Sequence, residues 1–229
     1  MGRFRPLARR SDRGGRESGG ARPACLRRSR ETLDRLRIYE DLLRTWQKTI
    51  NLVSPATLDE VWHRHFADSA QLLALVPEGG KFWMDLGSGG GFPGLVLAIM
   101  LAETQPDARQ TLVESDSRKA AFLGEVARKT GVAVEIRAER SEKAATQLKS
   151  QIKDVVTARA LAPLPKLLGL VQPFFSPRTV ALFPKGREAQ VEVGEARELF
   201  DFDCSLAPSL TDAQARIVIL RNLAVKSEG

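Results

Sequence analysis

The 229-residue chain has few cysteines and no long apolar run. Its two cysteines, Cys25 and Cys204, have no partners at the spacing of a metal site and cannot supply a disulfide framework. We therefore expect a reducing, cytoplasmic setting and no bound metal. No apolar stretch approaches the roughly 20 residues that cross a bilayer, and the arginine-rich beginning lacks the apolar segment of a secretory signal. We expect no membrane association.

Positive charge is concentrated at the beginning of the chain. Residues 1–30 contain ten arginines against Asp12 and Glu17, a net charge of +8, so residues 31–229 carry +7 minus +8, or −1. Glycine and serine are interspersed without periodicity, which predicts a disordered tail over residues 1–30. Three explanations stay open for this tail: an RNA-attracting arm, an organellar targeting peptide, or upstream sequence from a misassigned start codon.

Residues 31–78 are predicted to form a helical extension. The apolar residues of the first helix recur at intervals of three and four: Leu36, Tyr39, Leu43, Trp46 and Ile50. This periodicity predicts one amphipathic helix. Thr57-x-x-Glu60 is typical of a capping box and predicts a second helix that runs to about residue 75. On that helix, His65 and Asp68 have the spacing of a local i,i+3 pair.

The segment from Lys81 to Gly94 is interpreted as a strand, a glycine loop and the start of a helix. Its glycines lie at positions 87, 89 and 91. Phe92 stands where the dinucleotide fingerprint requires its third glycine, which disfavours a nicotinamide-dependent oxidoreductase. Asp85 completes an acidic-x-G-x-G-x-G pattern typical of S-adenosylmethionine enzymes. A carboxylate suits the ammonium and sulfonium groups of that cofactor, whereas it would repel a pyrophosphate.

Residues 79–229 are predicted to form a single α/β domain. Further strands are predicted over 110–115, 132–137, 153–157 and 179–183, and helices over 117–130, 141–150, 163–171 and 187–199. The last two strands, at about 202–207 and 216–221, follow one another without a helix, so we expect an antiparallel hairpin at the sheet edge. A seven-stranded, mostly parallel sheet that ends in such a hairpin is the class I methyltransferase architecture, a Rossmann-like fold.

Ligands of such sheets bind at the carboxyl ends of the strands. Glu114 follows the second strand, where its carboxylate could accept hydrogen bonds from ribose hydroxyls. Ala138 and Glu139 follow the third strand and could border an adenine. Arg159 and Lys185 follow the fourth and fifth strands, where a charged residue is equally well explained as the first contact with solvent.

Several motifs occur in order over residues 31–223. They are Trp46-x-Lys48-x-x-Asn51-Leu52, His65-Phe66-x-Asp68-Ser69, Asp85-Leu86-Gly87-Ser88-Gly89-Gly90-Gly91-Phe92-Pro93-Gly94, Arg118-Lys119-x-x-Phe122-Leu123, Arg159-Ala160 and Lys185-Gly186. This combination resembles the RsmG (GidB) family of bacterial small-subunit ribosomal RNA guanine-N7 methyltransferases. Two positions depart from the family pattern: Gln47 stands where Asn is common, and Ile217 follows Arg216 where His is usual.

The resemblance implies S-adenosylmethionine-dependent methylation of N7 of guanine 527 (ribosomal RNA numbering) in 16S RNA. The implied partner is 16S RNA or the small ribosomal subunit, and we expect a monomer. With the glycine motif included, the candidate cofactor-binding residues are Asp85, Gly87, Gly89, Phe92, Glu114, Ala138, Glu139 and Arg159. The candidate RNA-binding residues are Asn51, His65, Arg118, Lys119 and Lys185.

The chemistry of guanine N7 predicts catalysis by alignment. N7 is an unprotonated acceptor with an in-plane lone pair, so its attack on a sulfonium methyl group needs no general base. We therefore expect no catalytic acid or base, with Arg159 and Lys185 as candidate positioning groups for guanine O6 or a phosphate. The alternative is a non-catalytic RNA-binding or ribosome-assembly factor that has the same fold.

Overall fold

The structure, a computed structural model, describes residues 24–76, 79–148 and 151–226. Most of the predicted disordered tail therefore lies outside the described residues. The end of that tail differs from the prediction, because Ala24–Leu26 forms a short 3-10 helix (η1) and the Leu26 side chain is buried. Ser29 then caps the first α-helix by accepting a hydrogen bond from Thr32 N at 3.2 Å. The folded part of the chain thus begins before residue 31.

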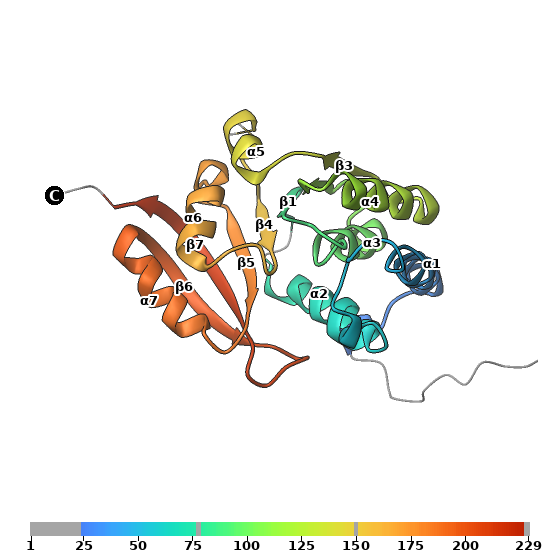
Figure 1. Cartoon of the computed structure of the whole chain (residues 1–229). Helices are drawn as coiled ribbons and strands as arrows, with labels where there is room; N and C mark the ends of the chain where they lie inside the picture. The colour runs from blue at the N-terminus through green and yellow to red at the C-terminus, as the bar shows by residue number, and fades with distance from the viewer. Residues whose placement is uncertain (1–23, 77–78, 149–150, 227–229) are drawn as a thin grey trace, which may run out of the picture.

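One seven-stranded sheet lies at the centre of the molecule, in the order β3-β2-β1-β4-β5-β7-β6 (Figure 1). The strands are β1 (Phe82–Leu86), β2 (Arg109–Val113), β3 (Val134–Arg137), β4 (Val155–Ala158), β5 (Val180–Lys185), β6 (Phe200–Pro208) and β7 (Arg216–Val225). β1 to β5 run parallel, whereas β7 pairs antiparallel with both β5 and β6. The predicted mostly parallel sheet that ends in an antiparallel hairpin is confirmed.

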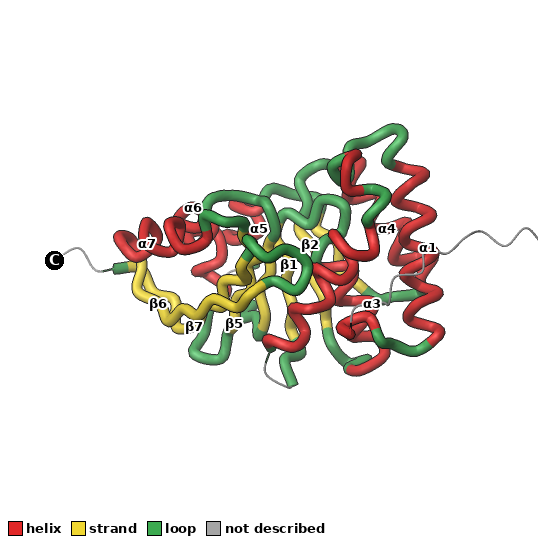
Figure 2. Tube along the Cα trace, turned by 90° about the horizontal axis from the view of Figure 1, so that it is seen from below, coloured by secondary structure: helices red, strands yellow, loops and turns green. Residues whose placement is uncertain are grey.

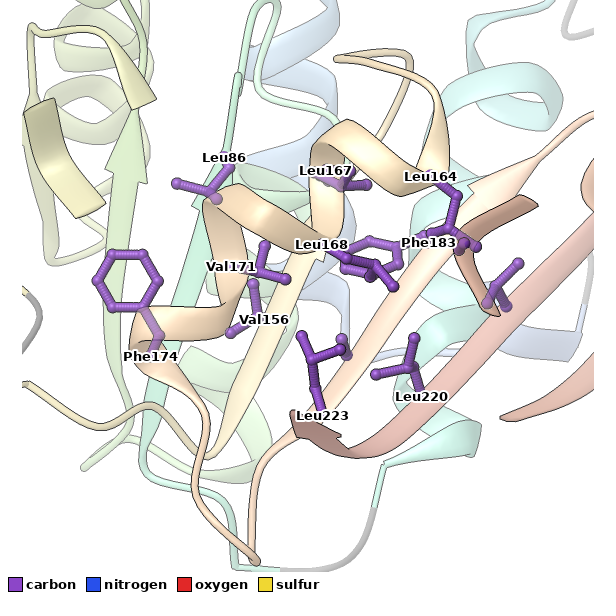
Figure 3. Close-up of a cluster of buried hydrophobic side chains, with 14 of the residues drawn as sticks. Leu86, Val156, Leu164, Leu167, Leu168, Val171, Phe174, Phe183, Leu220 and Leu223 are labelled. Atoms are coloured by element: carbon purple, nitrogen blue, oxygen red, sulfur yellow. The ribbon is translucent and has the colours of Figure 1, made fainter. Parts of the chain in front are cut away.

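Helices cover both faces of this sheet (Figures 1 and 2). They include α1 (Arg30–Trp46), α2 (Asp68–Ala70), α3 (Gly94–Thr104), α4 (Ser117–Thr130), α5 (Ser141–Gln147), α6 (Leu164–Val171) and α7 (Ala189–Leu199). α3 and α4 pack on one face beneath α1, while α5, α6 and α7 pack on the other. Figure 3 shows Leu164 and Leu168 of α6 beside Phe183 of β5. No described helix has the length and apolarity needed to cross a membrane.

The ends of α4 are set by neighbouring residues. The Asp116 carboxylate accepts hydrogen bonds from Arg118 N at 2.8 Å and Lys119 N at 3.4 Å, which satisfies N–H groups that have no partner within the helix. Gly131 ends the helix with φ +69°, a left-handed conformation that glycine adopts at little cost. The helix predicted over 117–130 is therefore confirmed at both ends.

The N-terminal helices share one hydrophobic core with the sheet layer. Leu36 and Tyr39 of α1 are buried in the cluster that contains Leu95 of α3. The helix ends at Trp46, and Ile50 is buried in the turn beyond it rather than on the predicted helical stripe. The helical extension is thus packed onto the remainder of the protein through apolar side chains, which fixes its position relative to the strand ends.

The second N-terminal helix differs from the predicted one. It combines a π-helical segment, η3 (Trp62–Ala67), with the single turn of α2 and a 3-10 segment, η4 (Gln71–Leu75). Thr57 does not cap it, because Pro55–Thr57 forms a separate 3-10 turn (η2). The Thr57 hydroxyl instead lies 2.8 Å from Nε2 of His65. The predicted capping box is therefore wrong. The Thr57 hydroxyl instead links the η2 turn to His65 of η3.

Candidate functional site

The glycine loop between β1 and α3 is packed on one side and open on the other. Gly87, Gly89 and Gly91 have φ values of +66°, +56° and +92°, in the region that favours glycine. A Cβ on Gly91 would meet the Tyr39 hydroxyl and would lie 3.0 Å from Leu95. A Cβ on Gly89 would meet only a backbone oxygen, at 3.8 Å. The open side at Gly89 lets a ligand approach the backbone of the loop closely.

The loop borders a cavity of about 320 Å³ at the carboxyl ends of the parallel strands. Five of the predicted cofactor residues line this cavity: Gly87, Gly89, Phe92, Glu114 and Arg159. They come from the glycine loop and from the ends of β2 and β4. The sheet brings them together because the carboxyl ends of neighbouring parallel strands meet at one edge.

Glu114 is buried at the end of β2, where both carboxylate oxygens accept backbone hydrogen bonds. Oε2 accepts from Gly89 N at 2.7 Å, and Oε1 accepts from Asp116 N at 2.8 Å. Each oxygen keeps a second lone pair. Glu114 therefore joins the glycine loop to the start of α4 and can still accept hydrogen bonds from a ligand in the cavity.

Asp85 lies beneath the loop rather than in the cavity lining. Its Oδ1 accepts a hydrogen bond from the Thr157 hydroxyl at 2.6 Å, and its Oδ2 accepts one from Gly94 N at 3.3 Å. Complete burial raises the pKa of Asp85 to about 6, although these hydrogen bonds partly oppose the shift. In this position the carboxylate holds β4 and the start of α3 and does not line the cavity.

Ala138 and Glu139 lie beside the cavity but do not line it. Glu139 forms ion pairs with Arg137 at 3.0 Å and with Lys143 at 3.6 Å. Ser141, two residues later, is part of the lining. The chain that follows β3 therefore reaches the cavity slightly later than the sequence predicted.

Two leucines that were not among the predicted site residues also line the cavity. Leu52 reaches it from the N-terminal helical layer, and Leu161 reaches it from the segment after β4. Ala160 has φ +53°, which is uncommon for a residue with a Cβ, and it directs the chain so that Leu161 covers Gly87. A Cβ on Gly87 would lie only 2.6 Å from Leu161 Cδ1. Nothing in the local sequence marks this contact.

Gln47 positions the segment that carries Leu52. Its Oε1 accepts hydrogen bonds from Leu52 N at 2.9 Å and Val53 N at 3.1 Å, and its Nε2 donates to the Val53 carbonyl at 2.8 Å. An amide side chain is needed for this combination of donor and acceptor. The other departure from the family pattern, Ile217, is buried in β7.

A larger groove of about 990 Å³ adjoins the cavity. Leu52, Arg159 and Leu161 line both spaces and so form the border between them. His65 from the N-terminal layer and Lys185 from the end of β5 also line the groove. Within the described residues, no group of three or more His, Cys, Asp or Glu side chains could hold a metal ion.

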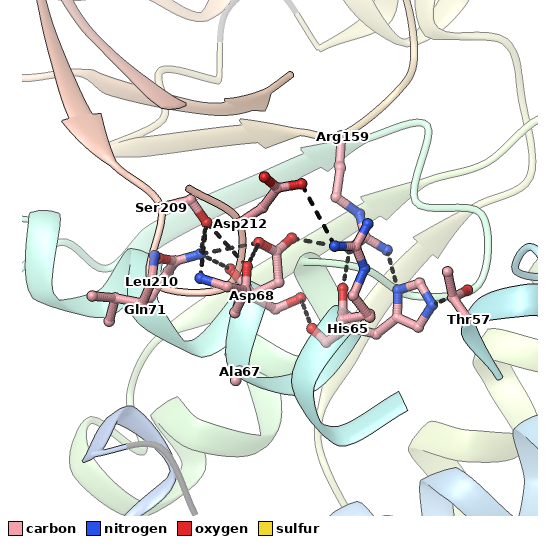
Figure 4. A network of polar contacts seen from close by, with 12 residues as sticks. Thr57, His65, Ala67, Asp68, Gln71, Arg159, Ser209, Leu210 and Asp212 are labelled. Carbon is pink, nitrogen blue, oxygen red and sulfur yellow. Dashed lines mark hydrogen bonds and ion pairs between the residues drawn. The ribbon is translucent and has the colours of Figure 1, made fainter. Parts of the chain in front are cut away.

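Arg159 is held at this border by the N-terminal layer (Figure 4). Its guanidinium donates to Asp68 Oδ2 at 3.1 Å, to His65 Nδ1 at 3.0 Å and to the Arg64 carbonyl at 3.4 Å. Its Cζ lies 5.1 Å from the ring centroid of Phe92. His65 and Asp68, which were predicted to form a local pair, are joined through Arg159 instead.

His65 is neutral, and its partners fix its tautomer. A guanidinium has only donors, so Nδ1 must accept from Arg159 and the proton must lie on Nε2. Nε2 then donates to the Thr57 hydroxyl. Burial, together with the charges of Arg159 and Arg64, lowers the pKa of His65 to about 3. Both ring nitrogens are therefore engaged within the protein, although the sequence suggested His65 as an RNA-binding residue.

The other predicted RNA-binding residues fall into two groups. The Lys185 side chain is only 9% exposed, and its Nζ donates to Glu192 Oε2 at 2.7 Å and to a backbone carbonyl at 2.8 Å. Lys185 thus connects the end of β5 to the segment before α6 and to α7. Asn51 and Arg118 are exposed, and Lys119 is half-buried beside the smaller cavity. These three are the predicted residues that remain accessible to RNA.

Comparison with known proteins gives consistent matches over most of the chain. A family model described as rRNA small subunit methyltransferase G (GidB) matches residues 32–218. The ribosomal RNA small subunit methyltransferase G of Parvibaculum lavamentivorans is 52% identical over 195 residues, which cover 85% of each chain. The protein of the same name from Rhodospirillum centenum is 52% identical over 196 residues, covering 86% of this chain and 87% of that protein.

Solved structures share the fold at low sequence identity. An O-methyltransferase from Bacillus cereus in complex with SAH has a TM-score of 0.58 and 12% identity, over 87% of this chain and 94% of that chain. A putative O-methyltransferase from Klebsiella pneumoniae has a TM-score of 0.57 and 15% identity, over 86% and 92%. These likenesses show the class I methyltransferase fold. The family model and the relatives at 52% identity go further: the chain belongs to the rRNA small subunit methyltransferase G family.

Proposed function

We propose that this protein transfers the methyl group of S-adenosylmethionine to N7 of guanine 527 in 16S RNA. Family membership gives a methyltransferase of small-subunit ribosomal RNA, and the atom and position follow from the resemblance in the sequence. The observation that carries the proposal is the pair of adjoining spaces with Arg159 at their border. The cofactor would occupy the smaller cavity and the target guanine the groove, so that the methyl group crosses the border.

The smaller cavity fits the cofactor in size and in chemistry. Its volume lies within the range of roughly 300–1,000 Å³ that is typical of small-molecule sites. The open space beside the Gly89 backbone suits the methionine moiety, and the free lone pairs of Glu114 suit the ribose hydroxyls. The chain after β3 would border the adenine at Ser141, with Ala138 and Glu139 directly before it. Phe92 would contribute through the guanidinium of Arg159 that it supports.

The larger groove suits a nucleobase better than a phosphate. Its lining contains three cations (Arg64, Arg159 and Lys185) and four carboxylates (Asp68, Asp212, Glu192 and Glu195), so 3 minus 4 leaves a net charge of −1. Each cation is paired with a carboxylate, at distances of 3.5, 3.1 and 2.7 Å. Because phosphate contacts rely on positive charge, the RNA backbone would lie outside the groove, near Arg118 and Lys119.

The proposed reaction needs no proton transfer at the nucleophile. S-adenosylmethionine supplies an electrophilic methyl group, and the N7 lone pair forms the new C–N bond as the C–S bond breaks. The protein contributes alignment of the two reactants, which is worth several orders of magnitude in rate. His65 is not a base in this scheme, because its Nδ1 lone pair accepts the Arg159 hydrogen bond and its pKa is about 3.

The test uses small-subunit RNA from a strain that lacks this protein. The RNA, free or within the subunit, is incubated with the protein and labelled S-adenosylmethionine, and the modified base is then mapped. We expect label on N7 of guanine 527, with the protein active as a cytoplasmic monomer. Label on another base would contradict the proposed position. Tight RNA binding without any transfer would favour the non-catalytic RNA-binding or assembly factor.

A further inference from the structure

The turn between β6 and β7, residues 209–215, is fixed against the N-terminal helical layer. Leu210 N donates to Gln71 Oε1 at 2.7 Å, and the Thr211 hydroxyl donates to Asp68 Oδ1 at 2.7 Å. Figure 4 shows this turn beside the helix that carries Asp68 and Gln71. The geometry of a hairpin is ordinarily set by its own strands and turn. These contacts additionally fix the turn relative to a helix about 140 residues away in the sequence.

Asp68 connects this turn to Arg159. Its Oδ1 accepts hydrogen bonds from the Thr211 hydroxyl and, at 3.0 Å, from Gln71 Nε2. Its Oδ2 accepts from Arg159 Nη1 at 3.1 Å. The side chains of Asp68 and Arg159 are only 16% and 20% exposed, so water competes weakly for the carboxylate. The turn thus sets the orientation of a carboxylate whose other oxygen holds the guanidinium.

Arg159 has little freedom of its own at the border of the two spaces. His65 accepts from its Nη2, and the guanidinium lies over the Phe92 ring. Neither contact involves the β6–β7 turn, which reaches the guanidinium through Asp68. A rotation of the Asp68 carboxylate would therefore shift the guanidinium relative to the cofactor cavity as well as the groove.

We propose that Thr211 is a positioning residue for methyl transfer and that it acts through Asp68 on Arg159. The inference rests on the proposed function, which places RNA in the groove lined by Thr211 and the cofactor in the cavity lined by Arg159. We call the path from Thr211 through Asp68 to Arg159 the relay. Through this relay the geometry of the cofactor cavity depends on the β6–β7 turn, which lines the groove. Because coupling between binding sites is reciprocal, RNA contact at the turn and cofactor binding change each other's affinity by the same factor.

Three variants of the full chain distinguish the effect of the Thr211 hydroxyl from the effect of the shape of that side chain. Thr211→Val removes the donor but keeps the branched shape, and Thr211→Ser keeps the donor. Thr45→Val is the matched control, because Thr45 is exposed on α1 and its hydroxyl donates, among the described residues, only to the Asp41 carbonyl at 2.8 Å. Calorimetry without RNA gives the Kd for S-adenosylmethionine. We expect a roughly 3- to 30-fold weaker Kd for Thr211→Val, since part of a charge-assisted hydrogen bond is relayed, and wild-type values for the other two.

The relay itself is tested with Asp68→Asn. If Thr211 acts through Asp68, combining Thr211→Val with Asp68→Asn should weaken cofactor binding no further than Asp68→Asn alone. Additive losses would overturn the relay. Equal losses for Thr211→Val and Thr211→Ser would indicate a steric role and would overturn it too.

Kinetics with small-subunit RNA supply the remaining distinction. A higher KM for RNA in Thr211→Val, with the Kd for S-adenosylmethionine unchanged, would mean that the turn contacts RNA only, which overturns the relay. The wild-type protein is measured first. A wild-type protein that binds no S-adenosylmethionine would overturn the proposed function and the relay together. Normal wild-type binding with an unaffected Thr211→Val variant would overturn the relay alone.

Discussion

Replacement of Asp85 by Asn should change the pH dependence of stability, because a carboxylate is buried beneath the glycine loop. Burial raises the pKa of Asp85 from 3.8 to about 6. The folded protein therefore binds this proton more tightly than the unfolded chain does. The associated stability is fully present below about pH 3.8 and is lost as the pH rises through about 6. The difference between 6 and 3.8 corresponds to about 3 kcal/mol, which the wild-type protein has lost by pH 8.

The Asp85→Asn variant carries no charge at any of these pH values. Its amide oxygen can accept from Gly94 N, and its amide nitrogen can donate to the Thr157 hydroxyl. That hydroxyl can in turn donate to the Met84 carbonyl, which lies 3.5 Å away. The free energy of unfolding of the variant, relative to wild type, should thus rise by about 2 kcal/mol between pH 4.5 and 8, with most of the change below pH 6.5.

Urea unfolding of both proteins at intervals of half a pH unit measures this difference. Titrating groups that the two proteins share cancel in the subtraction. Asp116→Asn is a control of opposite sign, since the Arg118 side chain lowers the pKa of Asp116 and Asn still caps α4. The stability that ionised Asp116 contributes is fully present above about pH 3.8, so the difference between wild type and that variant should stay nearly constant from pH 4.5 to 8 and should shrink only at lower pH. A difference between wild type and Asp85→Asn that stays constant from pH 4.5 to 8 would refute the reasoning.

Three further predictions concern the loop and the chemistry. Tyr39→Phe removes the buried donor to the Gly90 carbonyl, so it should lower the free energy of unfolding by about 1–3 kcal/mol. It should also weaken S-adenosylmethionine binding. Denaturation measures the first effect and calorimetry the second. Gly89→Ala should lower the free energy of unfolding by only about 1–2 kcal/mol, through backbone strain, but should bind the cofactor more weakly. Gly91→Ala should be less stable than Gly89→Ala, because its Cβ would meet Tyr39. Melting curves with and without cofactor distinguish the two variants. The single-turnover rate of methyl transfer should be nearly constant from about pH 6.5 to 9, because N7 needs no base and the pKa of His65 is about 3; a bell-shaped profile would reveal an essential titrating group.

Much of the fold could be predicted because its signals are local. Asp116 and Gly131 act on the backbone of residues next to them, so the bounds of α4 follow directly from the sequence. The glycines at 87, 89 and 91 likewise locate a turn that needs positive φ. Alternation of strands and helices then places the strand ends at one edge of the sheet, which is why the sequence alone assigns Glu114 and Arg159 to one site.

The contacts that complete the site could not be predicted, because they join distant segments. His65 and Asp68 have the spacing of a local pair, yet the partner of both is Arg159, which lies 94 and 91 residues further along the chain. Thr57 matches a capping motif, but its hydroxyl faces His65. Lys185 ends a strand, where a cation is often exposed to solvent, and its contacts with Glu192 and the Ala162 carbonyl, which explain why its side chain is only 9% exposed, come from distant segments.

The charges around the border suit a reaction that moves positive charge across it. In the proposed transfer the sulfonium in the cavity loses its charge while the guanine ring in the groove gains one. Arg159 lies between them, but Asp68 balances its charge, and burial beside the same guanidinium keeps His65 neutral. Lys185 is balanced by Glu192. An unpaired cation at either position would oppose the charge that develops on the ring, whereas a lining with a net charge of −1 favours it. The ion pairs make Arg159 and Lys185 poor partners for RNA phosphates. The same pairs keep the N–H groups of Arg159 and Lys185 in the site while they cancel the positive charge that would oppose methyl transfer.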